Sequence, residues 1–507
     1  MLTRAEATGF RETSLHADVM AFVAALAQAR DPRLHVTDFG VSPQGRTLPL
    51  LVLSERGVTT PQQARALGRP VVLVLDGIHP GEVEGKEASL ALVRDLLAGT
   101  DELDALLRHI TLVVVPLFNP DGNDALDPHN RRLDLAKLSG QPGPLVGTRT
   151  QSHGINLNRD YLRQAAPEMR ALQSRVCIPW APDLTIDNHA TNGSVHRFHM
   201  SVDIPHTVKS GRAEPIEFMR ERLVPEVMAA VRTRGFDSGW YGNFAEDERI
   251  LDAGGDVDPT TSVGEGWMTY PHHPRFGSNY RGLTNRLDLL LECYSYLSFE
   301  QRVATASAWQ IETLRWVAAH ADDVREVVAA SQRPPDRIAV RYRLEAFRAP
   351  VEVLTRTPRT LEGAPTSVRL PHYANFVGTT VVDRPRAYLV PPPVAEHLRA
   401  HGLSVTPATG TLACERATLE QASSEGGRAI LEAASFGDLS VSWRRERVEP
   451  PPGWSMVATD QPLGAIAVYL CEPESDDGAF ENGLLPLPAV GETLPSARVL
   501  DDTAAAP

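Results

Sequence analysis

A histidine and a glutamate three residues apart are the first residues of this chain whose types and spacing could do chemistry. His79 and Glu82 follow the apolar run Val71–Leu75. An imidazole at a strand end and a carboxylate near the start of a helix can point at one ion, and nitrogen and oxygen ligands suit zinc. The pair is short enough to occur by chance, so its interpretation as two-thirds of a zinc site depends on the motifs that follow.

The amino-acid composition argues against some classes of binding partner. The 507 residues include 64 acidic and 50 basic residues, for a net charge of -14, and there is no basic block. This balance argues against nucleic acid and anionic membrane as partners. The four cysteines lie far apart without a Cys-x-x-Cys pair, so any metal must be bound by histidines and carboxylates. Peptides and small amides remain as substrates.

The chain carries no obvious targeting segment. Its N-terminal sequence lacks the continuous apolar stretch of a signal peptide, and no segment approaches the length of a membrane span. We therefore expect a cytoplasmic protein, or a secreted one if an N-terminal signal was trimmed. A homo-oligomer is left open.

From about residue 34 to residue 290, apolar runs alternate with amphipathic stretches, which is typical of an α/β domain. Four of the expected strands are almost wholly apolar, as in a sheet that is covered on both faces. A helix is expected over Glu82–Ala98, with Gly99 as its stop, and another around Trp309–Val327. The expected strands are residues 48–54, 69–78, 109–118, 183–189 and 286–294.

A proline-containing segment at residues 331–336 predicts a domain boundary. Before it we expect a catalytic domain over residues 1–332. After it, alternating runs and proline clusters predict a β-rich C-terminal domain over residues 337–495, with one helix near residues 394–403. Residues 496–507 lack apolar periodicity and are expected to form a loose tail.

Four further motifs follow His79 and Glu82 in a fixed order. They are Asn119-Pro120-Asp121-Gly122, Asn156-Leu157-Asn158-Arg159, Asp187-Asn188-His189 and Leu290-Leu291-Glu292. In this order they resemble the zinc carboxypeptidase family, the carboxypeptidase A-like metallopeptidases, over about residues 35 to 300. The resemblance implies an α/β fold with a mixed, mostly parallel sheet flanked by helices. It also implies an enzyme that hydrolyses the C-terminal peptide bond of peptides.

The resemblance assigns roles in the metal site. It implies that one Zn²⁺ ion is bound by His79, Glu82 and His189, with a fourth position left for water. It implies that Glu292 is the general base, which takes a proton from the attacking water and passes it to the leaving amine.

The resemblance also assigns substrate contacts. Asn158 and Arg159 match the pair that binds the terminal carboxylate of the substrate, for which a planar guanidinium is suited. Arg149 is our choice for the cation that stabilises the oxyanion, and Arg131 and Arg132 are the alternatives.

At three positions the sequence departs from the family pattern or matches it ambiguously. Asn156 stands where many family members have an aspartate that orients a zinc histidine, and Asp187 or Asp76 could serve instead. For the active-site tyrosine of the family we choose Tyr280, with Tyr270 and Tyr241 as alternatives. Arg286 is expected to add a second cation to the substrate pocket. A further set of histidines is expected in loops or at the surface, namely His196, His199, His206, His272 and His273.

Other functions compete with the leading interpretation. An aspartoacylase-like or desuccinylase-like zinc amidohydrolase resembles the same family and acts on small N-acyl amino acids. An endopeptidase of the same fold, or an enzyme that trims glutamates from protein tails, is a narrower variant. A non-catalytic peptide-binding protein of this fold would lack the catalytic residues, and Glu292 and the three ligands are all present here.

Overall fold

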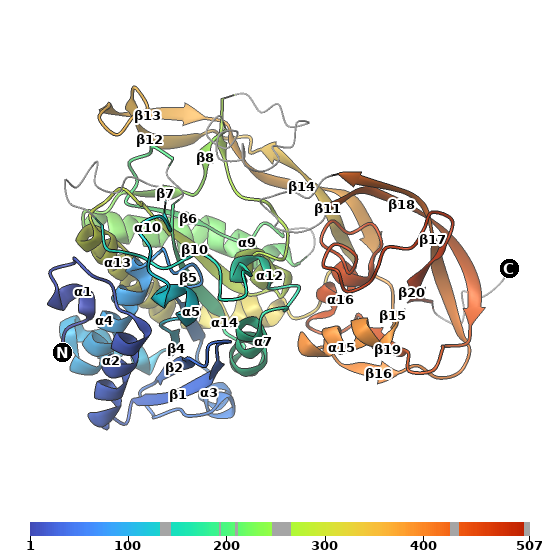
Figure 1. Ribbon diagram of the computed structural model, residues 1–507, viewed down its shortest axis with the longest axis horizontal. Coiled ribbons are helices and arrows are strands. Elements are labelled where there is room, and N and C mark those ends of the chain that lie inside the picture. The colour runs from blue at the N-terminus through green and yellow to red at the C-terminus, as the bar shows by residue number, and fades with distance from the viewer. Residues whose placement is uncertain (132–142, 192–193, 208–210, 246–264, 426–434, 501–507) are drawn as a thin grey trace.

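The computed structural model of the protein describes residues 1–131, 143–191, 194–207, 211–245, 265–425 and 435–500 (Figure 1). An eight-stranded sheet with the order β1-β2-β4-β3-β5-β10-β6-β7 forms the centre of the first part of the chain. β4, β3, β5 and β10 are mutually parallel, while β2 and β6 pair with this group in the antiparallel direction. The strands are β1 (Leu34–Val41), β2 (Thr47–Leu53), β3 (Val71–Leu75), β4 (Thr111–Val115), β5 (Leu184–Ala190), β6 (Met200–Asp203), β7 (Ser238–Trp240) and β10 (Leu287–Cys293).

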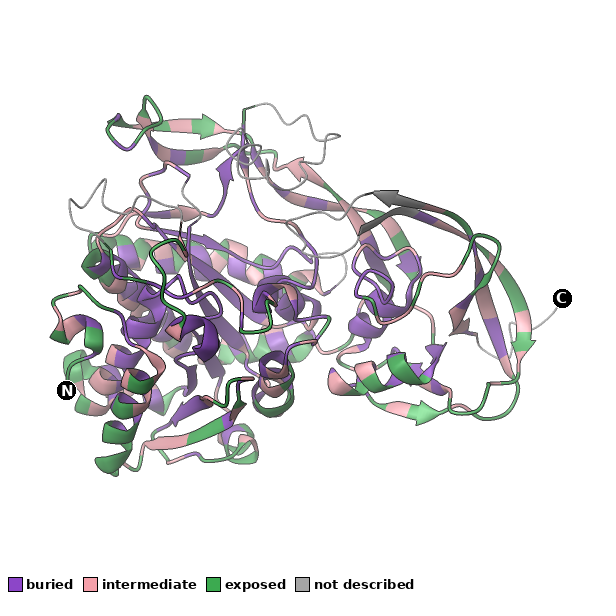
Figure 2. Cartoon of the chain, viewed as in Figure 1, coloured by how far each residue is buried: buried purple, intermediate pink, exposed green. Residues whose placement is uncertain are grey.

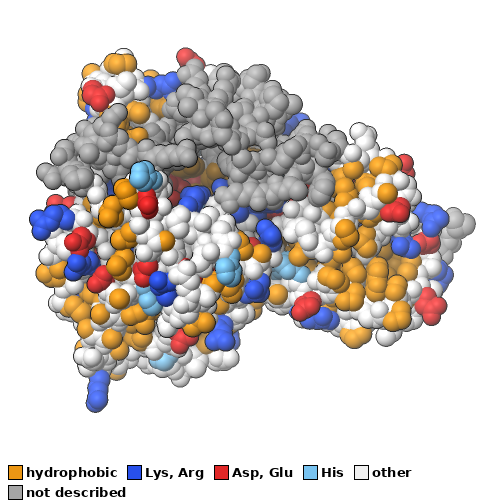
Figure 3. Space-filling view, in the orientation of Figure 1, with side chains coloured by type: hydrophobic (Ala, Val, Ile, Leu, Met, Phe, Trp, Pro, Cys, Tyr) orange, Lys and Arg blue, Asp and Glu red, His pale blue; other side chains and the backbone are white. Residues whose placement is uncertain are grey.

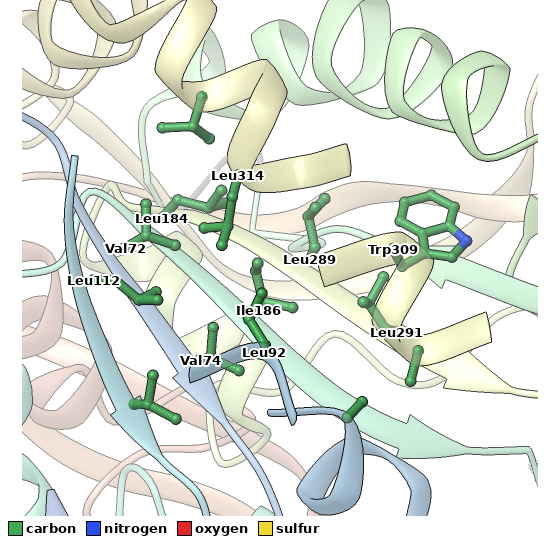
Figure 4. Packing of buried hydrophobic residues seen from close by; sticks show 14 of the residues in the cluster. Val72, Val74, Leu92, Leu112, Leu184, Ile186, Leu289, Leu291, Trp309 and Leu314 are labelled. Carbon is green, nitrogen blue, oxygen red and sulfur yellow. The ribbon is translucent and has the colours of Figure 1, made fainter. Parts of the chain in front are cut away.

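One face of the sheet is covered by helices. Val72, Val74, Ile186 and Leu291 point from the parallel strands into a cluster that also holds Trp309 (Figure 4). Because the sheet is buried on both faces, its central strands have long apolar stretches in their sequences. The α-helices whose residues join this cluster are α2 (His16–Gln28), α4 (Glu84–Ala98), α9 (Ala213–Phe218), α10 (Val224–Thr233), α13 (Phe299–Ala319) and α14 (Ala321–Ala330).

The other face packs against helices from both halves of the chain. Leu73 and Val113 join a second cluster that continues to Leu398 and Ile466 near the C-terminus. The buried interior therefore extends from the large sheet into the C-terminal part (Figure 2). The helices that contribute are α3 (Pro61–Leu67), α7 (Pro167–Leu172), α12 (Gly277–Leu283), α15 (Pro392–Ala400) and α16 (Gly464–Cys471).

The C-terminal part is built mainly of antiparallel strands. A six-stranded sheet has the order β16-β19-β15-β20-β17-β18, and a second sheet has the order β11-β14-β9-β8. Because β8 and β9 precede residue 332, the second sheet joins both sides of the predicted domain boundary, and the division at residues 332–337 stays a prediction. The strands are β8 (Asn243–Phe244), β9 (Trp267–Met268), β11 (Arg337–Ala346), β12 (Val351–Thr357), β13 (Ala364–Leu370), β14 (His372–Asp383), β15 (Ala387–Val390), β16 (Val405–Pro407), β17 (Leu412–Glu425), β18 (Ser435–Val448), β19 (Ser455–Ala458) and β20 (Thr493–Val499).

The predicted elements of the large sheet are confirmed. α4 ends at Gly99, which adopts a left-handed conformation that glycine reaches without strain. The expected helix at 394–403 is α15, whereas the one at 309–327 is part of α13 and α14. The prediction of a loose tail is wrong for residues 496–499, because they belong to β20 and pair with β15 and β17. Residues 501–507 lie outside the described part of the chain.

The surface agrees with the mixed composition. Acidic and basic side chains are interspersed over the face in Figure 3, and apolar side chains gather over the C-terminal part. Among the described residues, none of the helices is both long and apolar enough to cross a bilayer.

Candidate metal centre

His79, Glu82 and His189 meet at the carboxyl ends of two neighbouring parallel strands. His79 and Glu82 lie in a turn between β3 and α4, which is closed by a hydrogen bond from the Glu82 N–H to the His79 carbonyl (2.9 Å). Pro80, between them, favours such a turn by fixing its own φ angle. His189 lies near the end of β5, whose Asp187 pairs with Leu75 at the end of β3. The predicted ligands therefore converge from two segments 107 residues apart.

The distances within this cluster are those of groups that face one centre. Glu82 Oε1 lies 3.2 Å from His79 Nδ1, and Glu82 Oε2 lies 2.9 Å from His189 Nδ1. The two Nδ1 atoms are 3.2 Å apart. All three side chains are buried, and their ligand atoms lie within 4.8 Å of one another.

The outer partners of the two imidazoles decide which nitrogen faces the centre. Asn156 Oδ1 lies 3.0 Å from His79 Nε2 and also accepts from the Asn158 N–H (3.0 Å), so the proton is on Nε2. Asp187 Oδ1 lies 3.3 Å from His189 Nε2, which is an ion-pair distance. In both imidazoles Nδ1 is then the nitrogen that faces the Glu82 carboxylate, and it is the atom available to a metal ion. Two imidazoles and one carboxylate are a donor set that fits catalytic zinc.

The structure shows which residues contact the outer nitrogens of the two zinc-binding histidines. Asn156 takes the place of the expected aspartate at His79, and Asp187 orients His189. Asp76 instead accepts from Asn188 Nδ2 (2.8 Å). Asp187 is itself held by the guanidinium of Arg281.

The pKa values of the three groups are shifted in ways that suit metal binding. Burial, together with the Arg149 cation, lowers the pKa of His79 to about 3, so its imidazole is neutral at pH 7. Burial raises the pKa of Glu82, but the two histidines outweigh this effect and the carboxyl remains ionised. Burial lowers the pKa of His189, while Asp187 and Glu82 together raise it well above the usual value. A metal ion must therefore displace a proton from His189.

Glu292 lies beside this cluster on the next strand. β10 runs parallel to β5, and the register pairs Glu292 with His189, so both side chains are on the same face of the sheet. Burial is the main reason that the pKa of Glu292 rises to about 8, and Glu82 adds to the rise. A carboxyl group with such a pKa beside a metal site is a candidate acid and base.

Arg149 and Arg131 approach the cluster differently. Arg149 Nη1 lies 3.1 Å from His79 Nδ1 and 3.4 Å from Glu82 Oε1, and about half of its side chain (47%) is exposed. Arg131 is bound by the carbonyls of Gly81 (3.2 Å) and Thr191 (2.9 Å). Arg131 thus ties two loops together, and Arg149 is the cation at the open side of the ligand cluster. Arg132 lies outside the described residues.

Asn158 and Arg159 lie in the short turn that begins at Asn156. Asn158 is buried, and its Oδ1 accepts from the Gly277 N–H (2.8 Å) at the start of α12. The Arg159 guanidinium lies over the Phe276 ring, 3.8 Å from its centroid. The oxygen of Asn156 therefore connects the zinc ligand His79 to the turn that carries Arg159.

Two predicted substrate residues lie elsewhere. Arg286 precedes the first residue of β10 and faces the Ala181 carbonyl (3.3 Å) and Asp183 (3.5 Å). It is separated from Glu292 by the length of the strand, about 20 Å, so its assignment to the substrate pocket is wrong.

The described contacts of Tyr280 lie outside the ligand cluster, and its role as the active-site tyrosine stays a prediction. Its ring is buried against Tyr161, and its hydroxyl is bound to His401 Nδ1 (2.7 Å). None of its described contacts reaches the ligand cluster. Of the two alternatives, Tyr270 packs against Phe276, the ring on which the Arg159 guanidinium lies, with ring centroids 5.5 Å apart.

The sequence interpretation missed Arg281. This buried side chain of α12 pairs with both Asp187 and Asp288 and donates to the Tyr161 hydroxyl (2.9 Å). It thereby fixes the carboxylate that orients His189. Its spacing from Asp187 carries no signal, because the pair forms only when α12 packs on the sheet.

The additional histidines all lie in loops, as expected, but four of the five are buried in the structure. His196, His206, His272 and His273 are each less than 9% exposed. His272, His273 and Asp476 place ligand atoms within 4.8 Å of one another. Both Asp476 oxygens already accept, from His272 Nε2 (2.8 Å) and from Tyr469 (2.6 Å), so we interpret this group as an ion pair.

Comparison with known proteins agrees with this site. The family model for Zinc carboxypeptidase matches residues 19–177, which include His79, Glu82 and Asn156 to Arg159. This part of the chain is thus similar to zinc carboxypeptidases. "Carboxypeptidase 2" of the fungus Trichophyton tonsurans is 22% identical over 489 residues, covering 92% of this chain and 82% of the relative.

Two further similarities cover smaller parts of this chain. "Carboxypeptidase B" of Astacus astacus is 28% identical over 105 residues, which is 21% of this chain and 32% of that protein. A metallo-carboxypeptidase from Burkholderia cenocepacia superposes with a TM-score of 0.40 at 20% identity, covering 59% of this chain and 67% of the other.

Proposed function

We propose that this zinc metallocarboxypeptidase removes residues from the C-terminal end of peptides, with Glu292 as the acid and base and Arg159 as the anchor of the terminal carboxylate. The observation that carries the proposal is the convergence of two groups. His79, Glu82 and His189 face one centre beside Glu292, and Asn156 connects this centre to the turn that carries Arg159.

The metal ligands set the place of the reaction. Zinc bound by His79, Glu82 and His189 supplies a Lewis acid that polarises a carbonyl and makes water acidic at neutral pH. Asn156 and Asp187 hold the two imidazoles with their Nδ1 lone pairs inward. The ligands therefore need little rearrangement when the ion binds.

Glu292 moves the proton. Its pKa of about 8 in the buried site lies close to neutral pH, and a bound dication lowers it. The carboxylate can then take a proton from the attacking water and release it to the leaving amine nitrogen. Transfer in both directions is efficient only when the pKa of the group lies near the working pH.

Two arginines bind negative charge at different points. Arg149, at the open side of the ligand cluster, stabilises charge that develops on the carbonyl oxygen of the scissile bond. Arg159 binds the terminal carboxylate, since its planar guanidinium is held flat by the Phe276 ring. Binding of the free terminal carboxylate by Arg159 would direct cleavage to the end of the peptide.

A pair of peptides that differ only at the C-terminus tests this proposal. The zinc-loaded protein is incubated with a peptide that has a free C-terminal carboxylate and with its C-terminal amide, and the products are read by mass spectrometry. We expect stepwise shortening of the free peptide, at least about tenfold slower cleavage of the amide, and no cleavage by Glu292→Gln. Internal cuts in both peptides would contradict an exopeptidase, and cleavage of N-acyl amino acids alone would favour the small-amide hydrolase.

A further inference from the structure

Two ion pairs tie the loop between β9 and α12 to the C-terminal part of the chain. Asp477 Oδ1 accepts from Arg275 Nε (2.9 Å) and Nη2 (2.5 Å), and Asp477 Oδ2 accepts from the Arg275 backbone N–H (2.8 Å). Both side chains are at most 2% exposed. The adjacent Asp476 pairs with His272 of the same loop at 2.8 Å. The C-terminal part therefore fixes this loop through both its backbone and its side chains.

The loop that Asp477 fixes contains Phe276, the ring that supports the proposed substrate-binding residue Arg159. Phe276, which directly follows Arg275, is the ring on which the Arg159 guanidinium lies, 3.8 Å from the centroid. The next residue, Gly277, donates to Asn158 Oδ1 (2.8 Å), and the Arg275 carbonyl accepts from the Tyr161 N–H (3.4 Å). The residues on both sides of Phe276 thus contact the turn that contains Arg159.

A second contact holds the other end of that turn. The Leu162 carbonyl accepts from His397 Nε2 (2.8 Å) and His401 Nε2 (3.0 Å), which lie in and after α15. His401 Nδ1 in turn accepts from the Tyr280 hydroxyl (2.7 Å) of α12. The C-terminal part therefore contacts the chain three residues after Arg159 as well as the loop beneath it.

We propose that Asp477 is a positioning residue for the recognition of the terminal carboxylate. It fixes Arg275, and thereby the Phe276 ring that keeps the Arg159 guanidinium in one orientation. A long arginine side chain binds best when its freedom is removed in advance, and small displacements of such an anchor cost substrate affinity. A buried aspartate bound to both the side chain and the backbone N–H of one arginine has few alternative arrangements. This inference rests on the proposed role of Arg159.

Asp477→Asn tests the inference, with Glu472→Gln as a matched control. Glu472 is equally buried in the C-terminal part and pairs with Arg498 (Oε1 to Nε, 2.8 Å), away from the 271–277 loop. Each substitution removes one buried carboxylate charge. We expect Asp477→Asn to raise KM for a free-carboxylate peptide about tenfold, with kcat changed less than about threefold, and Glu472→Gln to leave KM unchanged. Zinc content and thermal unfolding are measured for both proteins.

A double-mutant cycle with Arg159→Ala shows whether Asp477 acts through Arg159. In the Arg159→Ala background, Asp477→Asn should leave KM unchanged, because the anchor is already lost. If Asp477→Asn does not fold, Arg275→Lys replaces it, since lysine keeps the charge but not the two-nitrogen contact.

The outcomes separate this inference from the proposed function. Equal KM effects of Asp477→Asn and Glu472→Gln in an active enzyme, or an undiminished effect without Arg159, would overturn the inference alone. A wild-type protein that binds zinc and cleaves no C-terminal peptide bond would overturn both.

Discussion

Asn156 is the residue at which this chain departs most clearly from the pattern it resembles. Its Oδ1 accepts from both His79 Nε2 and the Asn158 N–H, so an amide satisfies two donors where a carboxylate is usual. An amide oxygen polarises an imidazole less than a carboxylate does, and the zinc ligand His79 is correspondingly less basic.

Substitution of Asn156 should therefore change zinc affinity in a predictable direction. We expect Asn156→Asp to bind zinc about tenfold more tightly and Asn156→Ala about tenfold more weakly, measured by competition with a chelator of known affinity. Equal affinities of the three proteins would show that the contact to His79 Nε2 does not tune the metal site.

Glu292 gives a second prediction at the residue scale, because activity and stability should change in opposite directions. Glu292→Gln should lower kcat by a factor of about 10³ while zinc content stays the same. The folded protein raises the pKa of this carboxyl, so its charged form is destabilising above the unfolded pKa near 4.5. The metal-free variant should therefore unfold at a higher temperature than the metal-free wild type at pH 7. A variant with full activity, or one that unfolds earlier, would contradict this assignment.

At the scale of elements, the packing of α4 on β5 holds the ligands in register. A Cβ atom on Gly85 would lie 2.4 Å from Asn188 Cβ and 2.6 Å from an Asp76 oxygen. Only glycine allows the helix that follows Glu82 to approach the strand that carries His189 this closely.

Gly85→Ala should therefore disturb both stability and metal binding. We expect a loss of about 1 to 3 kcal/mol in the free energy of unfolding and weaker zinc binding, since Asn188 must move beside His189. Ala91→Ser, on a half-exposed position of the same helix, serves as the control and should change neither property. Chemical denaturation and zinc titration measure the two effects, and an unchanged zinc affinity in Gly85→Ala would contradict the coupling.

The elements also show what could be predicted from the sequence. The strands Val71–Leu75 and Leu184–Ala190 are buried throughout, and the apolar residues at their starts allow the strands and the ligands after them to be predicted. Arg286 was misplaced because it is close to Glu292 in sequence but lies at the opposite end of β10. The partners of Tyr280 and Arg281 cannot be predicted from the sequence, since they are set by how α12 packs rather than by spacing.

The C-terminal strand was missed for a related reason. Residues 493–499 contain Pro495, and their buried positions are Leu494, Ala497 and Val499, which do not alternate regularly. A strand of this kind becomes visible only through its pairing with β15 and β17.

At the scale of the whole molecule, buried neutral histidines should make stability depend on pH. Burial lowers the pKa of His196 to about 3 and that of His372 to about 4. The unfolded chain binds protons at these residues near pH 6.5, and the folded protein does not. Stability is therefore fully present above pH 6.5 and falls as the pH drops toward 4.

Each of these histidines should lower the free energy of unfolding by about 1.4 kcal/mol for every pH unit between pH 6.5 and pH 4. Urea unfolding of metal-free protein at pH 7, 6 and 5 measures the slope. His372→Phe, in an aromatic environment that includes Phe347, should unfold with a shallower pH dependence. An identical slope in this variant would show that His372 does not titrate as its burial implies.

The most direct test of the central claim is to measure zinc content and peptide hydrolysis together while zinc is returned to chelator-treated protein. We expect no activity in the metal-free wild type, a rise in activity that is complete at one zinc ion per chain, and neither zinc binding nor activity in His189→Ala. Full hydrolysis by the metal-free protein, or equal zinc binding by His189→Ala, would contradict a site built from His79, Glu82 and His189.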